Sequence, residues 1–141
     1  MLSQSEIEDK RRELDERFTS LFKLAGIKYS RTWLLENQYW PKCEDYIDEI
    51  ITSPWYLFDT EFGLIKIGWR KRVISIDWEG TKLAENNRIS GKSFPIPEED
   101  KWITHGEYYV HAYTYEKALQ YLIILKNEMK KVQTLITLRS N

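Results

Sequence analysis

Residues 63 to 79 read GLIKIGWRKRVISIDWE, and the pattern of this stretch decides the fold. Two apolar runs rich in isoleucine each close on a Trp, and three consecutive basic residues separate them. β-Branched and aromatic residues in short alternating runs are typical of half-buried strands. The stretch therefore predicts an antiparallel β-hairpin whose turn carries the basic residues.

Side-chain chemistry selects one register for this hairpin. When Ile67 faces Ile76, every residue on that side is apolar, and Lys66 faces Asp77 on the other side. A cross-strand pair of opposite charges contributes about 0.2–1 kcal/mol. A slip of one residue would bury the charges among the isoleucines. We therefore expect both pairs, and the same register continues the apolar side with the pairs Trp69–Ile74 and Ile65–Trp78.

The preceding run, WYLFDT at 55–60, predicts a further strand that turns the hairpin into a meander. Two registers are open for it. In the first register, Tyr56 and Phe58 join the apolar face, and Trp55 and Leu57 lie on the second face. In the other register, Trp55 and Leu57 join the apolar face, and Tyr56 and Phe58 lie on the second face. Either way the second face receives apolar side chains and needs a cover, from this chain or from a partner.

Amphipathic helices are predicted at both ends of the chain. Residues 3–26 begin with two overlapping capping boxes in SQSEIE, carry an apolar stripe and end at Gly26, a residue suited to helix termination. Residues 114–136 repeat apolar residues at alternating steps of three and four. We expect both helices to pack on the apolar face of the sheet.

The remaining segments have weaker patterns. Residues 27–40 show no clean period and are either irregular or a short edge strand. A leading proline and an apolar stripe predict a helix over 41–52, on which Cys43 is buried and inert. Residues 80–106 are rich in turn residues and are expected to be mostly loop. Residues 107–113 form a fourth candidate strand, whose pairing the sequence leaves open.

These elements predict an α+β fold. It consists of an antiparallel sheet of three to four strands with the N- and C-terminal helices packed on one face. The expected strands are about 55–60, 64–70, 73–79 and 107–113. With 141 residues, the chain has the length of one domain, so we expect a single domain over 1–141.

Composition and charge exclude several classes of protein. A chain with 42% hydrophobic and 30% charged residues is typical of folded domains, and a net charge of −1 produces no overall attraction to nucleic acid. The single cysteine excludes an internal disulfide and suits a reducing compartment. No apolar stretch approaches the length of about 18 residues that spans a bilayer, and the N-terminus is charged where a signal peptide is apolar. We expect a cytoplasmic protein without a membrane partner.

The sequence contains no recognisable catalytic or metal-binding motif. The two histidines, His105 and His111, are six residues apart and match no zinc pattern. An acid–base site at His111 would need a neighbouring carboxylate, for which the candidates are Asp59, Asp77 and Glu107. A strand histidine that is hydrogen-bonded on a sheet face is the commoner arrangement. We therefore expect no enzyme activity, no metal and no cofactor.

Binding is the expected function, because charge is segregated along the chain. Residues 63–72 carry four basic residues and no acidic one, between acidic flanks. We expect a small non-enzymatic binding or inhibitor protein that masks a surface of a protein partner, of the accessory, immunity or phage anti-defence kind. The alternative is a nucleic-acid-binding accessory protein that uses the hairpin of Arg70, Lys71 and Arg72, with nearby Trp side chains stacking on bases.

The candidate partner surface combines the hairpin turn with the second face of the sheet. Because interface energy concentrates in Trp, Tyr and Arg, either Trp55 or Tyr56 is the expected aromatic anchor. The other candidates carry the charges that orient a partner. They are Lys66, Arg70, Lys71, Arg72 and Asp77.

Overall fold

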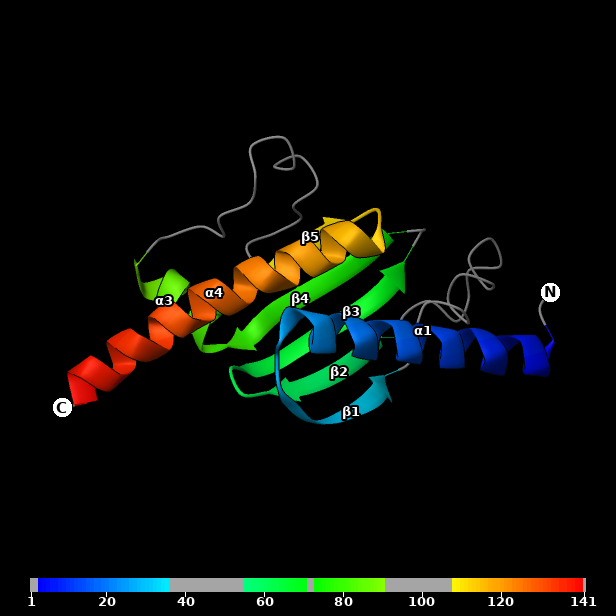
Figure 1. Ribbon diagram of the computed structural model, residues 1–141, viewed down its shortest axis with the longest axis horizontal. Coiled ribbons are helices and arrows are strands. Elements are labelled where there is room, and N and C mark those ends of the chain that lie inside the picture. The colour runs from blue at the N-terminus through cyan, green and yellow to red at the C-terminus, as the bar shows by residue number, and fades with distance from the viewer. Residues whose placement is uncertain (1–2, 36–54, 71–72, 91–107, 141) are drawn as a thin grey trace.

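The computed structural model describes residues 3–35, 55–70, 73–90 and 108–140. In this part of the chain, one antiparallel sheet forms a layer behind the helices α1 and α4 (Figure 1). The strands are β1 Tyr29–Leu35, β2 Trp55–Thr60, β3 Gly63–Arg70, β4 Val73–Thr81 and β5 Tyr109–Ala112. The helices are α1 Gln4–Ala25, α3 Lys82–Ser90 and α4 Tyr115–Ser140. The expected α+β class is confirmed.

The sheet has five strands, one more than expected, in the order β1-β2-β3-β4-β5. The additional strand is β1, which lies within residues 27–40 and occupies an edge of the sheet. Of the two readings of that segment, the edge strand is therefore correct. Its pairing with β2 shifts register between Tyr29 and Thr32, which explains why no clean period is visible in the sequence.

The central hairpin has the expected register over most of its length. Ile67 pairs with Ile76, and Lys66 pairs with Asp77. The register then shifts by one residue, so that Leu64 pairs with Gly80. The expected pair Trp69–Ile74 is formed. The expected pair Ile65–Trp78 is not formed, because it lies at the register shift. An extra residue in β4 causes this departure, yet Ile65 and Trp78 both remain in the core.

Strand β2 adopts the first of the two open registers. Tyr56 pairs with Ile67 and Phe58 pairs with Ile65, so both aromatic rings join the apolar face. Trp55 is opposite Gly68 on the second face.

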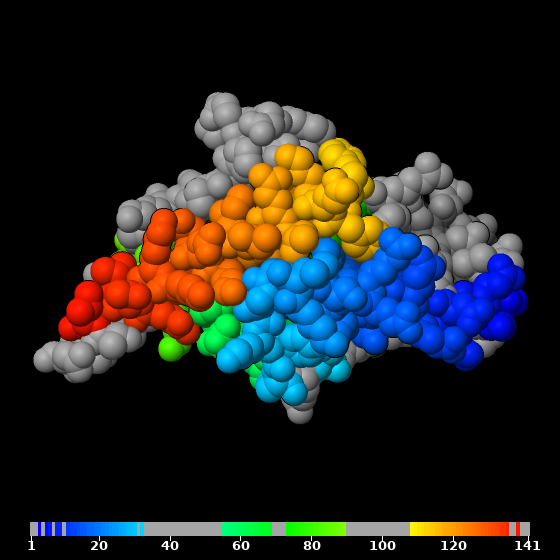
Figure 2. Space-filling model, viewed as in Figure 1, coloured from blue at the N-terminus to red at the C-terminus, as the bar shows by residue number. Residues whose placement is uncertain are grey.

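Helices α1 and α4 lie side by side over the apolar face and bury it (Figures 1 and 2). The ring of Phe22 in α1 stacks on Phe58 of β2 with centroids 3.9 Å apart. Large side chains that are almost completely buried come from both layers: Leu14, Phe18, Phe22, Phe58, Ile65, Ile67, Ile74, Ile76, Trp78, Tyr121, Leu122 and Leu125. The expected packing of both terminal helices on one face is confirmed.

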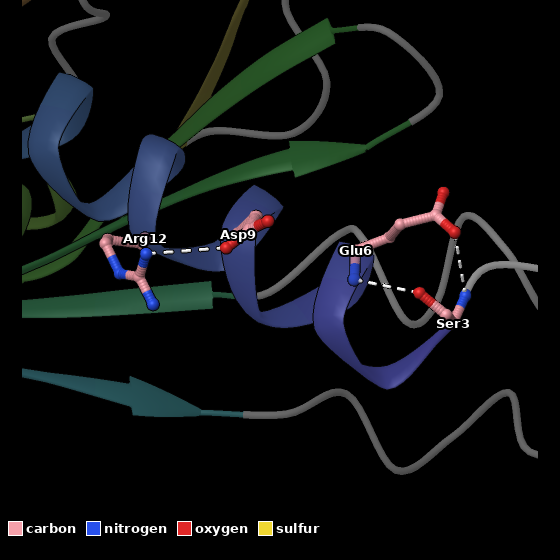
Figure 3. Close-up of polar contacts among 4 residues, drawn as sticks. All are labelled: Ser3, Glu6, Asp9 and Arg12. Atoms are coloured by element: carbon pink, nitrogen blue, oxygen red, sulfur yellow. Dashed lines mark hydrogen bonds and ion pairs between the residues drawn. The ribbon is translucent and has the colours of Figure 1, made fainter.

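The ends of α1 follow the sequence signals. The backbone N–H of Glu6 donates to the Ser3 hydroxyl at 3.1 Å, and the Ser3 N–H donates back to the Glu6 carboxylate at 3.4 Å (Figure 3). The first of the two overlapping capping boxes is thus the one in use. One turn further on, Arg12 and Asp9 form an exposed ion pair at 3.4 Å. At the other end Gly26 adopts the left-handed conformation, with φ of 72°.

Helix α3 corrects the expectation of loop for residues 82–90, whereas residues 91–106 lie outside the described residues. The Thr81 hydroxyl accepts a hydrogen bond from the Ala84 N–H at 3.3 Å, as an N-capping side chain does. Leu83 and Ala84 then enter the core. The helix has nine residues, too few for a visible helical period among polar neighbours.

Several expectations lie outside the described residues. These are the helix over 41–52 with Cys43, the turn residues Lys71 and Arg72, and His105.

The turn between β2 and β3 depends on glycine at position 63. Gly63 has φ of 118°, and a Cβ atom there would lie 2.5 Å from the carbonyl oxygen of Gly80 and 3.0 Å from Cα of Thr81. Thr60 closes the turn, because its hydroxyl donates to the Gly63 carbonyl at 2.6 Å and accepts from the Phe62 N–H at 3.1 Å. Position 63 thus requires both the conformation and the small size of glycine.

The apolar pair at the centre of the sheet gives the first prediction. Ile76→Ala removes a fully buried side chain and should lower the free energy of unfolding by about 2–5 kcal/mol in urea denaturation. Ile123→Ala on the outer side of α4, where the side chain is 40% exposed, is the control and should change it by less than about 1 kcal/mol. If Ile76→Ala lowered the free energy of unfolding by less than about 1 kcal/mol, the assigned register would be contradicted.

The second prediction concerns the turn. Gly63→Ala should destabilise the fold by about 1–3 kcal/mol, because an L-residue is strained at this φ and its Cβ collides with the backbone of β4. Glu61→Ala, an exposed change in the same turn, is the matched control. Equal urea midpoints for the two variants would show that the turn tolerates a side chain at position 63.

Candidate partner-binding face

The second face of the sheet, opposite α1 and α4, carries the residues that alternate with the core. Cross-strand pairing arranges them in two parallel rows. The first row runs through Leu57, Lys66, Asp77 and Tyr109. The second row runs through Trp55, Gly68, Ser75 and His111.

Asp77 is the centre of the first row. Its side chain is 6% exposed, and its Oδ1 accepts the N–H of Glu79 at 3.0 Å. The hydroxyl of Tyr109 is also hydrogen-bonded to this carboxylate. Burial, together with the negative charge of Asp77, raises the pKa of Tyr109, so its hydroxyl keeps the proton that it donates. Lys66 is the residue directly opposite Asp77 in the pairing of β3 with β4.

The second row contains a Ser–His hydrogen bond. Ser75 is 3% exposed, and its Oγ lies 2.8 Å from Nδ1 of His111 on the neighbouring strand. Of the carboxylates considered as partners for His111, Asp77 is two pairs away along the strands, and Asp59 lies on β2, three strands from β5. Glu107 lies outside the described residues. His111 is thus a hydrogen-bonded histidine on a sheet face.

The two rows make the second face amphipathic from one edge to the other. On β2 it carries Trp55, which is half-buried, and Leu57, which is buried. On β3, β4 and β5 it carries the hydrogen-bonded and charged groups. Gly68, which has no side chain, stands opposite Trp55 and is buried.

The structure places Tyr56, the other candidate anchor, in the core. Its ring packs edge-on against Phe18 at 5.4 Å, and its hydroxyl donates to the backbone carbonyl of Arg11 at 2.7 Å. Burial is the main cause that raises the pKa of Tyr56, followed by the negative charge of Asp15. Because Tyr56 is only 3% exposed, Trp55 alone of the two candidates lies on the second face.

The basic hairpin is placed only in part. Arg70 ends β3, where it pairs with Val73, and the positions of Lys71 and Arg72 lie outside the described residues. The structure therefore brings together Trp55, Lys66 and Asp77 on one face, and the contribution of the hairpin turn stays a prediction.

Sequence reasoning missed Tyr109 and the serine partner of His111 on this face. The signal was the alternation in YVHA, which sends Val110 and Ala112 to the core and leaves Tyr109 and His111 on the second face. Their partners Ser75 and Asp77 become identifiable only once β5 is paired with β4.

The described residues hold neither a side-chain cluster for a metal ion nor a helix able to span a membrane. Within those ranges, no group of three or more His, Cys, Asp and Glu side chains is placed to hold a metal ion. In the same part of the chain, no helix combines the length and the apolar character needed to cross a membrane.

The class defined by these observations is an α+β protein with an antiparallel sheet, helices on one face and a polar network on the other. Comparison of the chain with models of protein families, with curated proteins and with solved structures found no match.

The hydrogen bond of Tyr109 gives a prediction with a defined dependence on pH. Tyr109→Phe should cost about 0.5–1.5 kcal/mol at neutral pH, because Asp77 loses a donor. The pKa of Tyr109 is raised in the folded state, so its contribution is complete below the ordinary tyrosine pKa of about 10 and is lost as pH rises through the higher folded value.

Urea unfolding measured from neutral to strongly alkaline pH checks this dependence. The gap in stability between the parent and Tyr109→Phe should narrow as the medium becomes alkaline. Tyr108→Phe keeps the ring that packs on Trp78 at 5.3 Å and serves as the neighbouring control. A constant gap across the pH range would contradict the role given to the Tyr109 proton.

Proposed function

We propose that this protein is a small non-enzymatic binding protein that masks a surface of a protein partner, and that it docks through the second face of its sheet. The observation that best supports this function is the position of Trp55, a partly accessible indole at the edge of a network of fixed polar groups. Binding hot spots in protein interfaces are enriched in Trp, Tyr and Arg.

The surroundings of Trp55 suit an interface in two ways. The strands that carry the second face also hold charges of both signs, the half-buried Lys66 and the exposed Asp59 and Glu79. Charged side chains at the rim of an interface select the partner and speed association more than they raise affinity. The strands that carry these side chains are paired on both sides, so docking immobilises little additional backbone.

The way in which the polar groups are used favours binding over catalysis. Ser75 is buried and engaged with His111, and Asp77 is engaged by Tyr109 and by the Glu79 N–H. A nucleophile or general base has to reach a substrate atom, whereas Ser75 is only 3% exposed and Asp77 only 6% exposed. Held in this way, they keep the face rigid.

The hairpin of Arg70, Lys71 and Arg72 is included in the proposal as the part that orients the partner. In the nucleic-acid alternative, the same three charges would contact phosphates. Three such contacts give a salt slope of about −2.7, so binding should weaken roughly fortyfold between 50 and 200 mM salt.

Replacement of the anchor tests the proposal. Affinity capture from a native lysate, with and without nuclease, identifies partners of the parent protein, and each is then titrated against the variants. Trp55→Ala should weaken binding at least about thirtyfold, the equivalent of 2 kcal/mol. Leu24→Ala, which shortens a 70% exposed leucine on α1, should bind as the parent does.

The controls separate the alternatives. Thermal unfolding of Trp55→Ala should show that the variant is folded at the assay temperature. Capture that disappears with nuclease, together with loss of oligonucleotide binding in a triple Glu variant of Arg70, Lys71 and Arg72, would favour the nucleic-acid function. A partner that binds Trp55→Ala as tightly as the parent would contradict docking through the second face.

A further inference from the structure

Helix α4 continues beyond the core that it covers. Among its described side chains, Val132 is the last that is buried, whereas the helix runs on to Ser140. The end of α4 extends past the sheet, at the opposite side of the molecule from the start of α1 (Figures 1 and 2). We name residues 133–140 the overhang. Within it, Leu135 is 44% exposed and Leu138 is 67% exposed.

The two leucines do not belong to the stripe that packs on the sheet. Leu125, Met129 and Val132 form that stripe and are buried. Leu135 and Leu138 are three residues apart, and both lie on the side of the helix that also carries Lys131. The overhang therefore presents apolar groups on a side of α4 that its own sheet does not cover.

The charge around these leucines has one predominant sign. From residue 126 to the end of α4, four residues are basic, and Glu128 is the one acidic residue. Lys131 is 71% exposed and makes an ion pair with Glu128 at 3.0 Å. Lys130 and Leu138, with Gln133 and Thr134, line a hollow of about 400 Å³ on the adjacent side. The surface therefore carries a net positive charge beside two exposed leucines, with the charge of Lys131 partly offset by Glu128.

We propose that the overhang is a second docking surface, which binds an amphipathic helix of a protein partner. The apolar side of that helix covers Leu135 and Leu138, and its acidic residues meet Lys130 and Lys131. Charge complementarity selects an acidic partner. It also disfavours a second copy of the overhang, which would bring basic residues against basic residues.

The construction of α4 makes this surface ready to bind. A free helix of two turns is marginal in water because its first turn is costly to form. The overhang avoids that cost, since it is the continuation of a helix whose earlier turns are fixed in the core. Less ordering is therefore needed on binding than for an isolated segment.

Binding of synthetic helices to the full-length protein tests the proposal. The probe is a fluorescent peptide of about 18 residues, five helical turns, with leucines on one side and glutamates on the other. Its counterpart carries lysines in place of the glutamates. Fluorescence anisotropy should show that the Leu/Glu peptide binds at least about tenfold more tightly than the Leu/Lys peptide, and that added salt weakens its binding.

Variants assign the binding to the overhang. The double variant Leu135→Asp/Leu138→Asp should bind the Leu/Glu peptide at least about tenfold more weakly, because it loses the apolar contact and gains like charges. Leu24→Asp places the same charge on an exposed leucine of α1 and should bind as the parent does. The thermal unfolding midpoint should be the same in all three proteins, because none of these side chains is buried.

Three results would overturn the proposal. The first is absence of binding by the Leu/Glu peptide, and the second is equal binding of the two peptides. The third is a dimer in sedimentation that the double variant converts to monomer, which would assign the overhang to a second copy of this chain.

Discussion

The pairing of Ile67 with Ile76, and of Lys66 with Asp77 beside it, is the constraint on which the rest of the structure depends. Side chains alternate across a strand, so a single register divides every residue of β3 and β4 between two faces. The isoleucines create the surface on which α1 and α4 pack. The same register puts Asp77 on the second face, where Tyr109 of β5 is hydrogen-bonded to it.

Much of the fold could be predicted from the sequence, because local chemistry and global packing agree there. The capping box at Ser3 and the left-handed Gly26 mark the ends of α1, and the isoleucines fix the central hairpin. Where the sequence left the structure open, as at β1, or predicted it wrongly, as at α3, the causes are local. Strand β1 is irregular in its pairing, and α3 depends on a single capping hydroxyl, that of Thr81, and on nine residues. Neither leaves a period that sequence reasoning can detect.

Of the candidate site, only the residues placed by the register of the β3–β4 hairpin could be predicted from the sequence. Lys66 and Asp77 follow from the register, whereas Trp55 and Tyr56 were separable only by the pairing of β2. The network around Asp77 depends on a strand that is distant in sequence. Hydrogen bonds between such strands follow from topology, which composition and spacing do not reveal.

The order of the strands has a consequence for how the chain folds. Each strand of the sheet pairs with the next one along the chain, and short turns join β2, β3 and β4. Hairpins with such turns form on a scale of about 1–10 μs, and contacts between segments close in sequence favour rapid folding. The contact between α1 and α4 instead joins the two ends of the chain. The meander is thus suited to form early. The packing of the two terminal helices on it is then the slow, late step, because it joins distant parts of the chain.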